Sequence, residues 1–406
     1  MKAYERLIRY AKVHTTSDEK SGTHPSFKGE FDLANILVKE MKELGLANVY
    51  VDDKCYVYGT LPASKGFEGA KPLGLIAHMD TSPDASGKDV KPILHEKYDG
   101  SVITLPGSGA KMSPEKFPFL KDFVGETVIT TDGTTLLGAD DKAGISEIMT
   151  SLETIINEKR EHGTLKICFT PDEEIGEGAD YFDIKGFDAA YAYTVDGGDS
   201  NCLEYENFNA ASATIHIKGF SVHPGDAKNV MINASHLAME FHSMLPSDET
   251  PAHTEKREGF YHLTEMSGRV GEATLSYIIR DHDKDIFEKR KKTVEEAVSK
   301  MNAKYGEGTV KAEIKDSYYN MLEKILPHMH LIENARIAIK NAGMEPEEIP
   351  VRGGTDGARL SYEGLPCPNL GTGGFNYHGN FECTTVERMD RATEVILNLV
   401  DIYKNI

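Results

Sequence analysis

The stretch PLGLIAHMD, residues 72–80, decides the fold of this chain of 406 residues. Its apolar residues follow one another without alternation, which is typical of a strand buried on both faces of a parallel sheet. Apolar residues at helical spacing from Phe27 to Leu46 precede it, and the strand-like segment NVYVDDKCYVYG at 48–59 lies between them. We therefore predict an α/β fold, in which helices cover both faces of a mostly parallel sheet.

The same alternation continues beyond residue 80. The segment TVITTDGTTLLG at 127–138 is predicted to form strands, and LKICFT at 165–170 and AAYAYTV at 189–195 are predicted to be short buried strands. Apolar residues recur at helical spacing from Ile145 to Ile156, between the first and second of these segments. Helices that alternate with buried strands are the connections that a parallel sheet requires.

The pattern changes near Asn207, where a second module is predicted. In order, we expect a strand at 212–219, a helix at 231–245, strands at 259–268 and 273–281, a charged helix at 284–304 and a strand at 309–316. This β-α-β-β-α-β order is that of the split βαβ sandwich. The alternation of helical and strand patterns found before Asn207 resumes after Asn320 and ends with a helix from Thr384 to Tyr403. We predict a catalytic domain of residues 1–207 and 319–406, with an α+β domain of residues 208–318 inserted into it.

Composition excludes several classes of function. Lys and Arg number 45 and Asp and Glu 65, so the net charge of −20 disfavours nucleic acid and anionic membranes as partners. No segment approaches the roughly 20 apolar residues of a membrane span. The five cysteines never form a C-x-x-C pair, and the opening segment MKAYERLIRYAKV does not resemble a secretion signal. We therefore expect a cytoplasmic protein without a disulfide framework.

Acidic and imidazole side chains follow the predicted buried strands. They are His78, Asp80, Asp140, Asp141, Glu173, Glu174 and Asp196. Ligands of open α/β sheets bind beyond the carboxyl ends of the strands, so these groups could converge on one crevice. Taken singly, each has an ordinary explanation: Asp141 could cap a helix, and the pair Glu173 and Glu174 could be a solvated turn. Several carboxylates packed together would repel one another unless cations held them, and imidazoles with carboxylates suit Zn²⁺, Co²⁺ or Mn²⁺.

Five motifs in a fixed order carry a resemblance to a known family. They are HMDTSPD (78–84), LLGADDKAG (136–144), TPDEEIGEG (170–178), YTVDGGD (193–199) and NYHGNFE (376–382). In these motifs the chain resembles the dizinc exopeptidase family that also contains aminoacylases, carnosinases and glutamate carboxypeptidases. The resemblance implies a metal-dependent aminopeptidase that releases the N-terminal residue of tripeptides. It also implies short peptides as substrates and a homodimer formed through the inserted lid domain.

The resemblance further implies two zinc ions about 3.5 to 4 Å apart, bridged by Asp140 and by a water or hydroxide. His78 and Asp196 would complete the protein ligands of one ion, and Glu174 and His378 those of the other. Two further acidic residues have implied roles. Asp80 would orient the imidazole of His78, and Glu173 would be the general base that moves a proton from water to the leaving amine.

Substrate contacts implied by the resemblance have ordinary alternatives. His223, in FSVHPGDAKNVMINA at 220–234, could stabilise the oxyanion, or it could be a surface histidine. Arg280 could clamp the substrate carboxylate, or it could pair with Asp281 or Asp283. The segment RGGTDGARLS at 352–361 would bring three side chains near the substrate, unless it only caps a helix. Those three residues are Arg352, Thr355 and Asp356.

Other functions compete with the leading one. A deacylase of N-acyl amino acids, such as acetylornithine or succinyl-diaminopimelate, would use the same metal site. An inactive peptide- or metal-binding protein would be expected to have lost the general base, whereas Glu173 is present. A cysteine or serine hydrolase is disfavoured, because no Cys or Ser has a matching His and oxyanion pattern.

Overall fold

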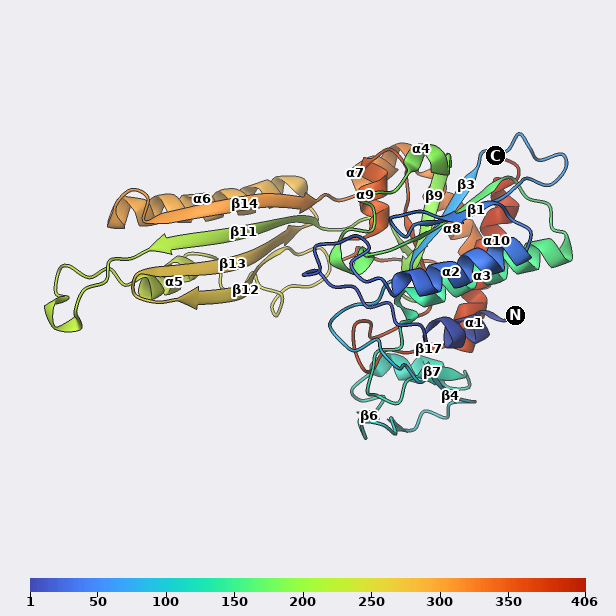
Figure 1. The fold of residues 1–406 in the computed structure, drawn as a ribbon, viewed down its shortest axis with the longest axis horizontal. Helices are drawn as coiled ribbons and strands as arrows, with labels where there is room; N and C mark the ends of the chain where they lie inside the picture. The colour runs from blue at the N-terminus through green and yellow to red at the C-terminus, as the bar shows by residue number, and fades with distance from the viewer. The chain divides into compact units, whose positions relative to one another are not determined.

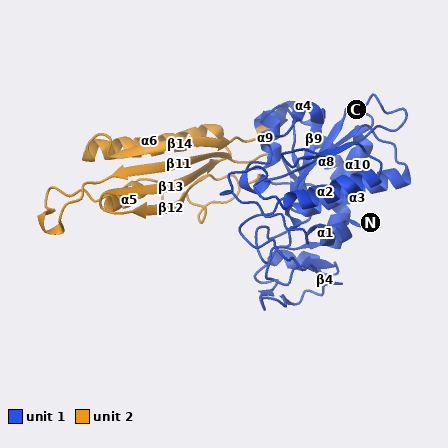
Figure 2. Ribbon diagram, in the orientation of Figure 1, with its two compact units in different colours: residues 1–205, 323–349, 355–406 blue, residues 206–322, 350–354 orange.

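The computed structural model describes residues 1–406, which form two compact units (Figures 1 and 2). Unit 1 comprises residues 1–205, 323–349 and 355–406, and unit 2 comprises residues 206–322 and 350–354. None of the helices is long and apolar enough to span a membrane.

Unit 1 is built on an eight-stranded sheet of order β1-β2-β8-β3-β9-β16-β10-β15. The strands are β1 (Ala47–Val51), β2 (Val57–Leu61), β3 (Leu73–His78), β8 (Leu165–Thr170), β9 (Tyr191–Gly197), β10 (Cys202–Glu204), β15 (Glu347–Glu348) and β16 (Asn369–Gly371). Strand β3 pairs in parallel with β8 and β9, and β9 pairs in parallel with β16. The centre of the sheet is therefore parallel, and antiparallel pairs join β1 to β2, β2 to β8, and β10 to β16.

Helices cover both faces of this sheet. The helices of unit 1 are α1 (Ala3–Tyr10), α2 (Glu30–Glu43), α3 (Ala139–Glu158), α4 (Ile184–Phe187), α8 (His330–Asn341), α9 (Asp356–Tyr362) and α10 (Val386–Tyr403), with the short α7 (Leu322–Ile325) at the unit boundary. On one face, Ala192 packs with Phe187 of α4 and Leu360 of α9. The adjacent Tyr193 faces the other way and donates its hydroxyl to the carbonyl of Leu331 in α8. All six residues of β3 are buried, as the uninterrupted apolar run predicted.

One strand prediction was wrong in its placement. Only Val128–Thr130 of the segment 127–138 forms a strand, β7, and it pairs antiparallel with β4 (Ile93–His95) and β17 (Thr384–Thr385) in a separate three-stranded sheet. The following residues turn, because Gly133 has a φ of +85° and Thr131 Oγ1 donates to the carbonyl of Thr135. Strands β5 (Ile103–Thr104) and β6 (Lys111–Met112) form a further small hairpin. The 3-10 helices of unit 1 are η1 (Pro118–Phe123), η2 (Glu173–Ile175) and η4 (Leu326–His328).

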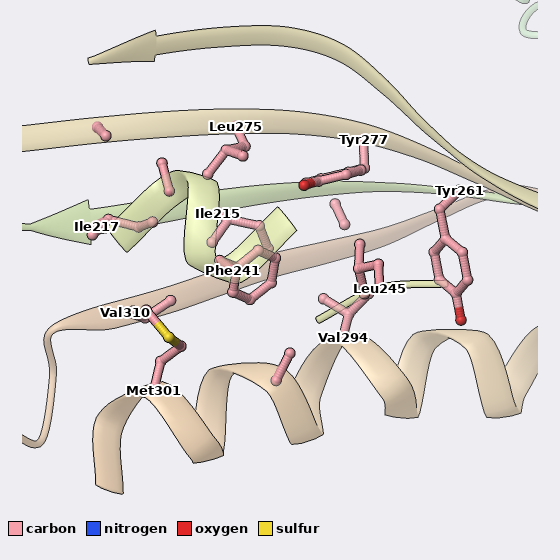
Figure 3. Packing of buried hydrophobic residues seen from close by; sticks show 14 of the residues in the cluster. Ile215, Ile217, Phe241, Leu245, Tyr261, Leu275, Tyr277, Val294, Met301 and Val310 are labelled. Atoms are coloured by element: carbon pink, nitrogen blue, oxygen red, sulfur yellow. The ribbon is translucent and has the colours of Figure 1, made fainter. Parts of the chain in front are cut away.

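Unit 2 is a four-stranded antiparallel sheet of order β12-β13-β11-β14 with two helices on one face (Figures 1 and 3). Its elements are β11 (Asn209–Lys218), η3 (Pro224–Asp226), α5 (Ala234–Ser243), β12 (Phe260–Gly268), β13 (Glu272–Asp281), α6 (Lys284–Tyr305) and β14 (Val310–Tyr318). Alternate residues of β11 and β13 are buried, and Ile215 and Leu275 pack with Phe241 of α5 and Val294 of α6. The predicted β-α-β-β-α-β module is therefore present.

A short later segment also belongs to unit 2. The predicted insertion covered 208–318, whereas the observed unit adds residues 350–354. Val351 donates its N–H to the carbonyl of Glu206 at 2.8 Å, and Arg352 donates to the carbonyls of Lys256 and Glu258. These contacts between distant parts of the chain leave no periodic signal in the sequence.

Candidate metal centre

Parallel strand pairing brings the predicted ligands to one edge of the sheet in unit 1. Strand β3 ends at His78, which is in register with Thr170, the last residue of β8. The chain beyond β8 forms η2, which carries Glu173 and Glu174, and the neighbouring strand β9 carries Asp196 near its end. Because parallel strands end on the same side, these groups converge there.

Asp140 divides its two carboxylate oxygens between two histidines. Oδ1 lies 2.9 Å from Nε2 of His78, and Oδ2 lies 3.2 Å from Nε2 of His378. His78 Nε2 is also 3.4 Å from Asp196 Oδ1, and His378 Nε2 is 2.9 Å from Glu174 Oε2. A carboxylate placed between two sets of donors has the arrangement that a bridging metal ligand needs.

Asp80 holds two parts of the centre together and is fully buried. Its Oδ1 lies 3.2 Å from Nδ1 of His78 and accepts the backbone N–H of Glu173 at 3.0 Å. Its Oδ2 accepts the backbone N–H of Glu174 at 3.1 Å. One side chain therefore fixes both the ring of His78 and the turn that carries Glu173 and Glu174.

The buried carboxylates of the centre favour the binding of positive charge. Burial raises the pKa of Glu174 to about 7, and the neighbouring Asp140 adds to this shift. Burial also raises the pKa of Asp196 to about 7 against the lowering effect of His78. Hydrogen bonds to Asp140 and Glu174 raise the pKa of His378 to about 11. Without other cations, the carboxylates and imidazoles of this centre therefore compete for the available protons.

The donor chemistry fits two divalent ions. His78 lies near Asp196 and His378 lies near Glu174, with Asp140 between the two histidines. Glu174 Oε1 is buried and has no hydrogen-bond partner, so one oxygen remains unsatisfied by the protein. Nitrogen and carboxylate donors without thiolate suit Zn²⁺, and also Co²⁺ or Mn²⁺.

Glu173 lies beside this centre, and its carboxylate interacts electrostatically with Asp196, His78 and Glu174. Burial and the charge of Asp196 raise its pKa well above the ordinary glutamate value. A carboxyl group with a raised pKa holds a proton more readily, which suits a group that must accept and return one.

Asp141 lies in the centre but is occupied by the backbone. Its carboxylate accepts the N–H of His78 at 3.1 Å and the N–H of Gly144 at 3.2 Å. The bond to Gly144 is a helix-capping contact, which was the ordinary explanation offered for Asp141.

Glu382 is a residue of the site that the sequence reasoning missed. It is 1% exposed, and its carboxylate accepts the N–H groups of Leu137 and Gly138 at 2.7 Å each and that of Asp140 at 3.0 Å. It ends the motif NYHGNFE, four residues after His378, and this position was the only signal in the sequence.

Thr355 and Asp356 begin α9 in unit 1. The hydroxyl of Thr355 accepts the N–H of Gly357 and caps the helix. Asp356 is 4% exposed and accepts the hydroxyl of Thr170 at 2.9 Å. Burial raises the pKa of Asp356 to about 6, and the charge of Asp80 contributes to this rise.

The other predicted substrate contacts lie in unit 2. His223 is exposed and accepts the N–H of Gly225. Arg280 donates to the carbonyl of Ile279 at 3.1 Å and stacks on the ring of Tyr318. Its alternative partners have other roles: Asp281 pairs with Arg290, and Asp283 caps α6.

Arg352 makes several contacts within unit 2. Its guanidinium donates to the carbonyls of Lys256 and Glu258 and to the hydroxyl of Thr254, and it stacks on Phe208. These contacts tie the segment 254–258 to the rest of unit 2.

Comparison with known proteins adds independent findings. Residues 205–309 match the family model described as a peptidase dimerisation domain. Peptidase T of Alkaliphilus oremlandii is 52% identical over 402 residues, which are 98% of each chain. The crystal structure of aminopeptidase PepT from Bacillus cereus has a TM-score of 0.79 at 22% identity and covers 99% of this chain and 98% of its own. A dinuclear metal-binding peptidase of the M20 family from Bacillus subtilis has a TM-score of 0.63 at 15% identity and covers 98% of both chains.

Proposed function

This chain belongs to the peptidase T family and is a tripeptide aminopeptidase, and we propose that Glu173 is the general base of its reaction and that Asp140 bridges two zinc ions. The observation that carries the proposal is the division of the Asp140 oxygens between His78 and His378. Each oxygen faces a separate group of donors, which is the requirement for a shared ligand.

Each ion would have three protein ligands. His78, Asp140 and Asp196 would hold one ion, and His378, Glu174 and Asp140 would hold the other. When bound, the ions supply Lewis acidity and positive charge that offsets the negative charge of the transition state. The imidazole-carboxylate donor set supports zinc, with Co²⁺ or Mn²⁺ as substitutes.

The protein's own groups would handle the proton. The carboxylate of Glu173 takes a proton from the attacking water and returns it to the nitrogen of the leaving amine, so that the C–N bond breaks without releasing an unprotonated amine. Asp80 keeps Glu173 in place through its bond to the Glu173 N–H, and the same carboxylate keeps the His78 ring oriented. Asp80 is therefore a positioning residue in this scheme.

The match to a peptidase dimerisation domain supports a homodimer formed through unit 2. All five cysteines are free and buried, which suits a reducing compartment and supports action in the cytoplasm.

A panel of di-, tri- and tetrapeptides, assayed with and without chelator, tests the function. We expect release of the N-terminal residue mainly from unblocked tripeptides, reversible loss of activity with chelator, and no turnover of N-acylated amino acids. Preferential turnover of the N-acylated compounds would identify a deacylase instead. Absence of turnover in a preparation loaded with metal would identify a binding protein.

A further inference from the structure

A second group of imidazole and carboxylate donors lies in unit 1 outside the centre described above. His24 Nδ1 is 3.2 Å from Asp172 Oδ2 and 3.6 Å from Glu177 Oε2. The donor atoms of these three residues all lie within 4.8 Å of one another. None of the three residues has a role in the proposed reaction.

The spacing of these donors matches that of the candidate metal centre. Ligands bound tetrahedrally to Zn²⁺ at about 2.0 to 2.2 Å are separated from one another by about 3.4 Å. The separations of 3.2 and 3.6 Å around His24 lie on either side of this value. In the candidate metal centre, His78 Nε2 lies 2.9 Å from Asp140 Oδ1 and 3.4 Å from Asp196 Oδ1.

Buried polar atoms of this group have no hydrogen-bond partner. The side chain of His24 is 5% exposed and that of Asp172 is 0% exposed. Neither ring nitrogen of His24 makes a hydrogen bond, and neither does Asp172 Oδ1. Asp172 Oδ2 accepts the backbone N–H of Ser26 at 2.7 Å. Buried polar atoms are normally satisfied, so unsatisfied atoms on two neighbouring metal-ligating side chains indicate a ligand.

A bound cation explains these unsatisfied atoms better than an ion pair between His24 and the carboxylates does. The contact of His24 Nδ1 with Asp172 Oδ2 at 3.2 Å does not meet hydrogen-bond geometry, and His24 Nε2 has no partner. Asp172 and Glu177 bring two carboxylates to the single imidazole of His24. One imidazolium would offset only one of these two negative charges.

The surroundings of His24 and Glu177 suit a site that an ion can enter. The ring of His24 is held by Tyr56 and Tyr181, whose ring centroids lie 5.8 and 4.7 Å away. The side chain of Glu177 is 44% exposed, so one ligand is open to solvent. Two ligands are therefore fixed and buried, and the third can close over an ion.

We propose that His24, Asp172 and Glu177 form a third binding site for a divalent cation of the zinc class. The ligands would be an imidazole nitrogen and two carboxylate oxygens, with water in the remaining position. Because Asp172 directly precedes Glu173, a cation bound here would hold the start of the turn that carries the proposed base.

Metal binding by the full-length protein tests this site without reference to activity. The apo protein is dialysed against buffered free Zn²⁺ over a range of concentrations, and the bound metal is measured by elemental analysis. We expect three equivalents in the unmodified protein, and two in His24→Ala. Glu177→Gln should bind the third equivalent at least about 10-fold more weakly, which is the range for loss of a partner at a metal site. His216→Ala, which removes an exposed histidine near Glu313, should keep all three.

Saturation of the unmodified protein at the zinc content of His24→Ala would overturn the proposal. A third equivalent that persists in both His24→Ala and Glu177→Gln would also overturn it, as would one lost in His216→Ala, since these results indicate adventitious zinc. If His24→Ala fails to fold, Glu177→Gln decides the question, because its side chain is partly exposed and its replacement is isosteric. The third site is read as the difference in zinc content between the unmodified protein and His24→Ala, so the result depends neither on the number of ions in the candidate metal centre nor on the aminopeptidase reaction.

Discussion

The carboxylate of Glu382 accepts the backbone N–H of Asp140 at 3.0 Å, across 242 residues of sequence. The same carboxylate holds Leu137 and Gly138, so it fixes the segment that carries the proposed bridging ligand. A residue that binds three N–H groups in this way would act on the proposed metals through Asp140, as a positioning residue.

Replacement of Glu382 by Gln should weaken metal binding. An amide offers one acceptor oxygen, and its NH₂ group would face a backbone N–H, so Asp140 would be held less firmly. We expect the affinity for Zn²⁺, measured by competition with a chelator, to fall about 10- to 100-fold. Activity should recover when excess metal is added.

Glu147→Gln is the matched control, because Glu147 is equally buried in unit 1 and has no hydrogen-bond partner. An unchanged zinc affinity in Glu382→Gln would show that the contact with Asp140 is dispensable for metal binding.

The sequence predicted the parts of this structure that leave a local pattern. The apolar run ending at His78 predicted a buried strand, and the acidic residues after neighbouring strands predicted a shared site. The clamp formed by Glu382 could not be predicted in this way, because it joins segments about 240 residues apart. The association of residues 350–354 with unit 2 and the placement of β7 depend on similar long-range contacts.

Loss of Asp140 should damage the metal centre more than loss of His378. Asp140 would serve both ions, whereas His378 would serve one. We expect Asp140→Ala to lose both ions from the centre and His378→Ala to retain one, as measured by elemental analysis after dialysis against dilute chelator. Equal metal content in the two variants would contradict the bridging role.

Glu173→Gln should lower kcat by about 10²- to 10⁴-fold, the range for loss of a general acid–base group. The metal content of the centre should stay unchanged, because Glu173 is not among the proposed ligands. Kinetics with a tripeptide and metal analysis of the same preparation give the two readouts. Near-full activity would assign the proton transfer to another group.

His282 should make unit 2 sensitive to acid. Burial lowers the pKa of His282 to about 4, and its residue is 7% exposed. Between about pH 6.5 and 4 the unfolded chain therefore binds a proton that the folded chain does not, so the contribution of His282 to stability falls as the pH falls.

His282→Gln should accordingly lose less thermal stability than the unmodified protein between pH 6.5 and 4.5. The difference between the melting temperatures of the two proteins is measured as a function of pH. His236→Gln, at an exposed histidine of the same unit, should follow the unmodified protein. Parallel curves for all three would show that burial of His282 has no effect on acid stability.

The preference for tripeptides is predicted to depend on Arg280. The proposed metals and Glu173 would act on the first peptide bond whatever follows it, so another group must recognise the far end of the peptide. The invariant feature of that end is its carboxylate, which lies about 7 Å beyond the first residue of an extended tripeptide. Arg280 is suited to bind it, because its guanidinium is held by Tyr318 and by the carbonyl of Ile279 and neither Asp281 nor Asp283 neutralises it.

Arg280→Ala should lower kcat/KM for tripeptides by about 10- to 100-fold, the value of a hydrogen bond to a charged group. Tripeptide amides should be poor substrates of the unmodified enzyme, and the variant should treat acids and amides alike. Arg269→Ala, which removes an exposed arginine from the same unit, should keep the preference for acids. Equal turnover of acids and amides by the unmodified enzyme would exclude a carboxylate clamp, and His223, Thr355 and Asp356 would then be the next side chains to test.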